Sequence, residues 1–138
     1  MLTKEELLAM PEGDYMNEAQ HGFFKALLTE QKDELTASIV AAKDSLAHSE
    51  HNTDPNDVAT QQEMQQLYLR TVERQGKLLN KVNESLQDIE NGDYGYCELL
   101  GEPIGIPRLL ARPTATLSIQ AKEAQEHKEK TVGNVARI

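Results

Sequence analysis

Tryptophan is absent from this chain of 138 residues, and aromatic residues make up only 4% of it. Hydrophobic residues account for 38%, which is little material for a large spherical core. A long helical arm needs only a narrow apolar seam, so it fits this composition better. The length allows one average domain, or one small domain with an appendage.

Cysteine is nearly absent as well. Cys97 is the only one, so no intramolecular disulfide is possible. The first residues, MLTKEELLAM, contain neither a basic segment nor a long apolar run, so we expect no signal peptide. No apolar run approaches the roughly 18 residues that suggest a membrane-spanning helix. These absences predict a cytoplasmic protein without a membrane partner.

Positive charge is scarce. The chain has 14 Lys and Arg against 23 Asp and Glu, which gives a net charge of −9. Proteins that bind nucleic acid usually present a basic face that displaces counterions from the phosphates. The acidic balance therefore argues against direct DNA binding and favours a protein partner.

Two long segments have the periodicity of helices. The first runs from about Asn17, a good N-cap residue, to His48, and the second from about Pro55 to Glu90, where NGDYG supplies a terminating glycine. The polar stretch SEHNTDP separates them, so we predict a long antiparallel coiled-coil hairpin. The apolar seam is expected to consist of Phe24, Leu28, Leu35, Ile39, Ala42 and Leu46 in the first helix, and of Leu67, Leu78, Val82, Leu86 and Ile89 in the second.

The rest of the chain divides into shorter parts. Residues 1–16 are expected to form a short helical segment that packs on a turn-rich globular part at 91–121. The hairpin occupies 17–90 with its tip near 49–57, and 122–138 form a C-terminal helix and tail. The predicted fold class is therefore mainly α.

Charge is distributed unevenly along the hairpin. Residues 44–63 contain five Asp and Glu and no Lys or Arg. Helix capping explains part of this acidic cluster, because Asp54 suits an N-cap position and Asp57 suits the first turn of a helix. Basic residues follow on the second helix at spacings of three and four, which a solvated helix face also produces. They are Arg70, Arg74, Lys77 and Lys81.

The stretch from GDYGYC to QAKE has the frame of a zinc ribbon, in which two C-x2-C pairs lie roughly 15–20 residues apart. Cys97 occupies the first ligand position, but the other three hold Leu100, Ser118 and Ala121. One thiolate does not make a tetrahedral site, so we predict a zinc-ribbon-like part without zinc and a buried, apolar role for Cys97. Apolar packing is expected to replace the metal, from Leu99, Leu100, Ile104, Ile106, Leu109, Leu110, Leu117 and Ile119.

Four blocks carry a resemblance to a known family: YMNEAQ, DPNDVA, GDYGYC and IGIPRLLARPTATL. In this order, from about Tyr15 to Lys122, the chain resembles the DksA/TraR family of bacterial RNA polymerase-binding regulators. The resemblance implies a hairpin that enters the secondary channel of the polymerase without binding DNA. Tip residues that carry activity in the family match Asp54, Asp57 and Ala59. The single cysteine resembles the zinc-independent DksA paralogues.

The resemblance also implies a guanosine tetraphosphate (ppGpp) site formed together with the polymerase. Its residues match Leu78, Lys81, Arg112 and Lys122. The basic residues that match further polymerase-contacting positions on the arm are Arg70, Arg74 and Lys77. The expected function is transcription regulation in the stringent response by a cytoplasmic, monomeric bacterial protein that needs no zinc.

Two other functions stay open at this stage. A transcript-cleavage factor would use Asp54 and Asp57 to hold a catalytic magnesium ion in the polymerase, although the DPNDVA block favours the regulator. A coiled-coil holdase or adaptor would use the arm without any polymerase. A stand-alone enzyme is not expected, because the sequence contains no nucleophile–base set and no phosphate-binding loop.

Overall fold

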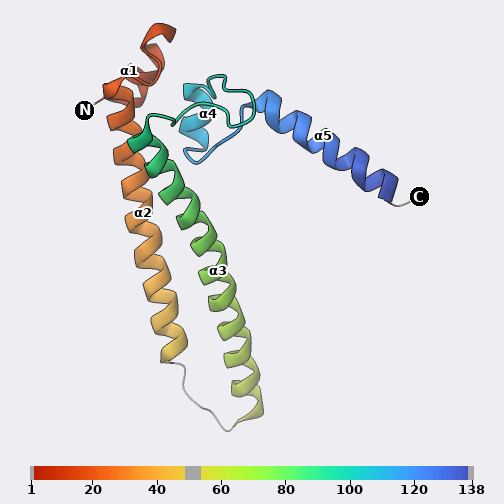
Figure 1. The fold of residues 1–138 in the computed structure, drawn as a ribbon. Coiled ribbons are helices and arrows are strands. Elements are labelled where there is room, and N and C mark those ends of the chain that lie inside the picture. The colour runs from red at the N-terminus through yellow and green to blue at the C-terminus, as the bar shows by residue number, and fades with distance from the viewer. Residues whose placement is uncertain (1, 49–53, 137–138) are drawn as a thin grey trace. The chain divides into compact units, whose positions relative to one another are not determined.

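The computed structural model describes residues 2–48 and 54–136. In chain order the elements are α1 (Lys4–Ala9), the 3-10 helix η1 (Glu12–Asp14), α2 (Glu18–Ala47), α3 (Pro55–Asn91), α4 (Ile106–Ala111) and α5 (Ile119–Ala136) (Figure 1). Within the described residues there is no strand, and one isolated antiparallel bridge joins Tyr96 to Pro103. The predicted mainly α class is confirmed.

Local sequence signals set the ends of the two long helices. Asn17 Oδ1 accepts a hydrogen bond from the backbone N of Gln20 at 2.9 Å, before the first turn of α2. Asp54 Oδ1 accepts one from the backbone N of Asn56 at 3.0 Å, at the start of α3. Gly92 follows α3 with a φ of 80°, which glycine tolerates. The two helices agree with the predicted ranges to within one residue at each end.

The chain forms two compact units. The arm unit is Leu27–Glu84, and the globular unit combines Met1–Ala26 with Ser85–Ile138. In the arm unit, α2 and α3 lie side by side and run in opposite directions, as the predicted hairpin requires (Figure 1). Residues 49–53, which belong to the predicted tip, lie outside the described residues.

The apolar seam of the arm unit was predicted correctly on α2 and partly incorrectly on α3. Leu28 and Ala42 are buried on α2. Leu67 and Leu78 of α3 are 54% and 42% exposed, so their assignment to the seam was wrong. One row of partly or fully covered positions on α3 instead recurs every three or four residues, at Gln61, Gln65, Tyr68, Val72, Gln75, Leu79 and Val82.

This spacing is that of the a and d positions of a heptad repeat, with glutamine at three of the seven positions. A search for apolar residues alone therefore misses the register. One of the glutamines carries an energetic penalty, because Gln75 Oε1 is buried and has no hydrogen-bond partner in the described part of the chain.

A small apolar core holds the globular unit together. Leu7 of α1, Phe24 of α2 and Leu109 of α4 are fully buried. The ring of Tyr94, which is only 3% exposed, lies 5.5 Å from that of Phe24, between centroids. Since α1 also contacts α4, the N-terminal segment packs onto this core.

Two tyrosine hydroxyls join distant segments of the globular unit. The Tyr15 hydroxyl donates to the carbonyl oxygen of Gly95 and accepts from the backbone N of Gly105 at 3.0 Å. The Tyr94 hydroxyl donates to the carbonyl oxygen of Pro113 at 2.7 Å. Burial raises the pKa of both hydroxyls, so both stay protonated donors at neutral pH.

The glycine within GDYGYC meets a strict steric demand. Gly95 has a φ of 91°, in the region that favours glycine. A Cβ atom at this position would lie 2.8 Å from Cγ of Met16. Conformation and space therefore both exclude a side chain beneath the Tyr15 hydrogen bonds.

Candidate functional site

The acidic residues at the start of α3 are exposed. Asp54 is the N-cap and engages one carboxylate oxygen with the backbone N of Asn56 at 3.0 Å. Asp57 lies in the first turn, where the helix dipole favours a negative charge. Ala59 is also exposed and leaves the adjacent surface without a long side chain. This end of α3 therefore presents two carboxylates to a partner, and their functional role stays a prediction.

Basic side chains form an exposed stripe further along α3. Arg70, Arg74, Lys77 and Lys81 are all exposed and lie on one face, since they are separated by four, three and four residues. Among the described residues the ion pairs are Lys25–Glu90 and His48–Asp44, and neither involves the stripe. The four charges are therefore available to an acidic partner.

Two of the residues assigned to the nucleotide come together in the globular unit. Arg112, just after α4, and Lys122, in the first turns of α5, line one hollow of about 560 Å³. Arg108 lines the same hollow and is fixed there, because its Nε donates to the carbonyl oxygen of Leu117 at 2.9 Å. Three cations around one hollow favour an anionic ligand with several charges.

Arg108 is not among the site residues predicted from the sequence. Its signal was available, because Arg108 and Arg112 are four residues apart in PRLLARP, the spacing that places two side chains on one helical face. The other two assigned residues, Leu78 and Lys81, are exposed residues of α3 in the arm unit. The exposure of Leu78 leaves its apolar side chain available for contact with another molecule.

The four positions of the zinc-ribbon frame do not fit a metal ion. Cys97, Ser118 and Ala121 are buried, whereas Leu100 is 60% exposed. Only Cys97 offers a thiol, while the Ser118 hydroxyl accepts from the backbone N of Ala121 at 3.2 Å. Residues 2–48 and 54–136 contain no group of three or more His, Cys, Asp or Glu side chains arranged to hold a metal. The donor set is thus far from the four ligands of a structural zinc site.

The Cys97 thiol is instead satisfied by the protein itself. Burial raises its pKa, but hydrogen bonds from the backbone N–H groups of Ser118, Leu100 and Leu99, and from the Ser118 hydroxyl, outweigh burial and lower the pKa below its usual value. These donors surround the sulfur from both turns of the frame. The turns are therefore held by hydrogen bonds at the point where a zinc ribbon would use its metal.

The prediction that apolar packing replaces the metal was only partly right. Ile104 and Leu109 are buried. Leu99, Leu100 and Ile119 are 65%, 60% and 55% exposed, so their assignment to the packing was wrong. Leu99 and Leu100 belong to a turn that is closed by a backbone hydrogen bond, in which Gly101 N donates to Cys97 O at 2.9 Å.

Within the described residues, no helix combines the length and the apolar character that crossing a bilayer requires. The arrangement is that of a binding protein, with an acidic helix end, a basic stripe and a cationic hollow.

Comparison with known families links these features to one group of proteins. Residues 20–89 match the family described as the N-terminal domain of the DnaK suppressor protein DksA. Residues 92–127 match the family described as the prokaryotic DksA/TraR C4-type zinc finger. The second match covers the frame in which three of the four ligand positions hold residues other than cysteine.

Several characterised proteins are similar over most of their length. The RNA polymerase-binding transcription factor DksA of Caulobacter vibrioides is 37% identical over 134 residues, which cover 94% of this chain and 92% of that protein. The protein of the same name from Escherichia coli is 40% identical over 124 residues, covering 87% and 80%. The structure of the transcription factor DksA2 from Pseudomonas aeruginosa matches with a TM-score of 0.84 and 48% identity, covering 93% of this chain and 99% of that one.

Proposed function

Because the chain belongs to the DksA/TraR family, whose relatives are named RNA polymerase-binding transcription factors, we propose that it regulates transcription by inserting its arm into the secondary channel of bacterial RNA polymerase. The observation that carries this proposal is the arm itself, a two-helix hairpin with exposed acidic residues where α3 begins and an exposed basic stripe beyond them. The protein acts in the cytoplasm as a monomer and without direct contact to DNA.

The two charged regions of α3 have different tasks in this proposal. Arg70, Arg74 and Lys77 contact acidic surface of the polymerase and supply affinity, because paired charges steer and fix the register of an interface. Asp54 and Asp57 act after binding, where their carboxylates influence elements of the polymerase active site and so alter the lifetime of promoter complexes. The small side chain of Ala59 lets the acidic end approach closely.

The cationic hollow supports a second element of the proposal, binding of guanosine tetraphosphate. Arg112 and Lys122 supply charge-assisted hydrogen bonds to phosphate, and arginine offers two parallel donors. The family resemblance assigns Leu78 and Lys81 to the same nucleotide, which is bound in full only in the polymerase complex. The protein alone therefore binds the nucleotide weakly.

The regulator does its work without zinc. The single thiol and the engaged Ser118 hydroxyl give no set of metal ligands, and the hydrogen bonds to Cys97 support the turns in its place. Such a protein would replace a zinc-dependent relative when zinc is scarce.

A transcript-cleavage factor is the second candidate, because two exposed carboxylates of α3 lie within one turn of each other. Such a factor needs both of them to hold a magnesium ion in the polymerase. One oxygen of Asp54 already accepts the backbone hydrogen bond of the helix cap at 3.0 Å, which favours the regulator.

The test compares Asp54→Asn and Asp57→Asn with a matched control, Asp33→Asn, which neutralises an exposed acid on α2. Asparagine keeps the size and the capping ability of aspartate, so all three variants should fold and compete equally for core polymerase. The two α3 variants should fail to inhibit a ribosomal-type promoter, whereas the control should inhibit normally. Normal regulation by both would reduce the acidic residues to helix caps, and stimulated cleavage in backtracked complexes by the wild type would favour the second candidate.

The nucleotide part has its own test. Lys81→Ala and Arg112→Ala should abolish the added effect of guanosine tetraphosphate on transcription and preserve the nucleotide-independent effect. Lys130→Ala, which removes an exposed cation from α5, is the control and should respond to the nucleotide like the wild type. Unchanged enhancement in Lys81→Ala and Arg112→Ala would show that these residues do not form the site.

A further inference from the structure

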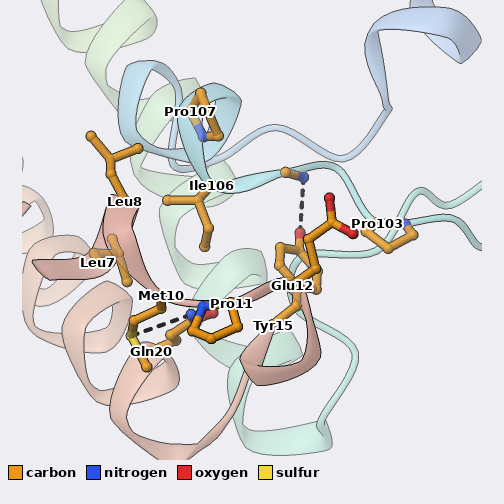
Figure 2. Close-up of a pocket in the computed structure, with 11 residues that line it drawn as sticks. Leu7, Leu8, Met10, Pro11, Glu12, Tyr15, Gln20, Pro103, Ile106 and Pro107 are labelled. Carbon is orange, nitrogen blue, oxygen red and sulfur yellow. Dashed lines mark hydrogen bonds between the residues drawn. The ribbon is translucent and has the colours of Figure 1, made fainter. Parts of the chain in front are cut away.

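The globular unit contains a second cavity, apart from the acidic helix end, the basic stripe and the cationic hollow. It has a volume of about 520 Å³ and is bordered by α1, the turn after it, the start of α2 and the segment 103–107 (Figure 2). Its size lies within the range of about 300–1,000 Å³ that is typical of ligand pockets. We call it the α1–α4 pocket.

The walls of the α1–α4 pocket are mainly apolar and partly uncovered. Leu8, Met10, Ile106 and three prolines contribute to them. Figure 2 shows Leu8 and Ile106 among the side chains of this lining. Leu8, on the six-residue helix α1, remains 54% exposed. Apolar side chains around an open cavity are typical of a surface that a partner covers.

A buried amide whose nitrogen donates only to a weak acceptor also lines the pocket. Gln20 is 1% exposed, and its Oε1 accepts from the backbone N of Met16 at 2.7 Å. In the part of the chain that the structure describes, the partner of its Nε2 is Met10 Sδ at 3.5 Å, drawn as a dashed line in Figure 2. A thioether is a weak acceptor, so this amide would donate more favourably to a carbonyl oxygen.

The segments that form the pocket are strongly acidic. Residues 2–20 and 102–107 together contain six Asp and Glu and one Lys. Glu12 lines the pocket itself and is exposed, and its carboxylate has no hydrogen-bond or ion-pair partner among residues 2–48 and 54–136. Charge complementarity therefore selects a positively charged occupant.

We propose that the α1–α4 pocket docks a basic linear segment of a partner protein. A bulky apolar side chain of the segment fills the cavity, a backbone carbonyl accepts the hydrogen bond of Gln20 Nε2, and a neighbouring Lys or Arg faces Glu12. A peptide segment supplies all three groups at adjacent residues. The proposal does not depend on the polymerase function, since no residue of the arm takes part.

The experiment measures fluorescence anisotropy of short labelled peptides with the full chain. A peptide with the core Lys-Leu-Phe-Lys should bind saturably, and peptides with Lys-Ser-Ser-Lys or Glu-Leu-Phe-Glu should bind at least about tenfold more weakly, because each lacks one of the recognised groups. Glu12→Lys and Leu8→Ser should weaken the first peptide to a similar extent. Both positions are exposed, so neither change should unfold the protein.

Matched controls carry the same changes elsewhere. Glu126→Lys makes the same charge reversal on α5, and Leu99→Ser alters a leucine that is 65% exposed; both should bind like the wild type. Equal weakening by the controls, or no saturable binding of the basic apolar peptide, would overturn the proposal. Self-association in sedimentation that Leu8→Ser abolishes would also overturn it, because the occupant would then be a second copy of the chain.

Discussion

Replacing the only cysteine distinguishes a fold held by its own hydrogen bonds from one held by a metal. In the structure, the Cys97 sulfur accepts from the backbone N–H groups of Leu99, Leu100 and Ser118, and from the Ser118 hydroxyl. In Cys97→Ser, the serine oxygen takes the place of the sulfur as the hydrogen-bond acceptor. The side chain becomes slightly smaller, so some buried volume is lost. We expect the free energy of unfolding to fall by only about 1 kcal/mol.

Cys97→Ala removes the acceptor altogether. The donors that faced the sulfur then lose their acceptor, and for those of the buried residue Ser118 this costs about 1–3 kcal/mol beyond the loss of volume. The expected order of stability is therefore wild type, then Cys97→Ser, then Cys97→Ala. A zinc-dependent fold behaves differently, because a structural zinc site supplies apparent binding energies of about 10–16 kcal/mol in small peptides, and either substitution would forfeit much of that.

The assay is urea unfolding followed by circular dichroism, in buffer with a chelator and in buffer with added zinc, combined with metal analysis of the purified protein. Each of the three proteins should keep its own unfolding free energy unchanged between the two buffers, and each should contain little zinc. Near-stoichiometric zinc in the wild type, together with a collapse of stability in the chelator, would refute the reasoning.

Three further predictions concern the same unfolding measurement. Tyr15→Phe removes two hydrogen bonds and should destabilise the protein by about 1–3 kcal/mol. Tyr96→Phe is the control and should change the stability little, because the Tyr96 hydroxyl has no hydrogen-bond partner in residues 2–48 and 54–136. Equal effects of the two substitutions would mean that the Tyr15 hydroxyl does not join the segments. Gln75→Leu replaces a buried, unpaired carbonyl by an apolar side chain and should stabilise the arm by about 1 kcal/mol; a loss of stability would show that the glutamine is satisfied in solution. Leu109→Ala should cost about 2–5 kcal/mol because the side chain is fully buried, and Leu99→Ala, at 65% exposure, should stay within about 0.5 kcal/mol; comparable losses would place the exposed turn in the core.

Much of the arm could be predicted from the sequence. The caps Asn17 and Asp54 and the terminating Gly92 act through backbone groups within a few residues, so they are recognisable in the chain itself. The basic residues of the arm that were matched to function are exposed. Their spacing of three and four residues along the sequence places them on one helix face. Periodicity alone predicted the two helices, whereas the family of the chain was predicted from its resemblance to known proteins.

The register of the α3 seam was decided by the tertiary structure. Leu67 and Leu78 have the apolar character of seam residues, yet Tyr68 and Gln75 are the half-buried ones. The neighbouring helix sets which face of α3 is covered, and a glutamine at a covered position looks like a surface residue in the sequence. A period can therefore be predicted while its phase stays open.

The replacement for the metal also required the three-dimensional structure. Tyr15 reaches Gly105 across 90 residues, and the turns around Cys97 are held by backbone donors that have no signature in the sequence. The absence of cysteine at three of the four frame positions is visible in the chain, and it predicts that no zinc ribbon forms. Which groups took over the task depended on contacts between distant segments, because hydrogen bonds of this kind are fixed by where the folded chain places each donor and not by the spacing of residues along it.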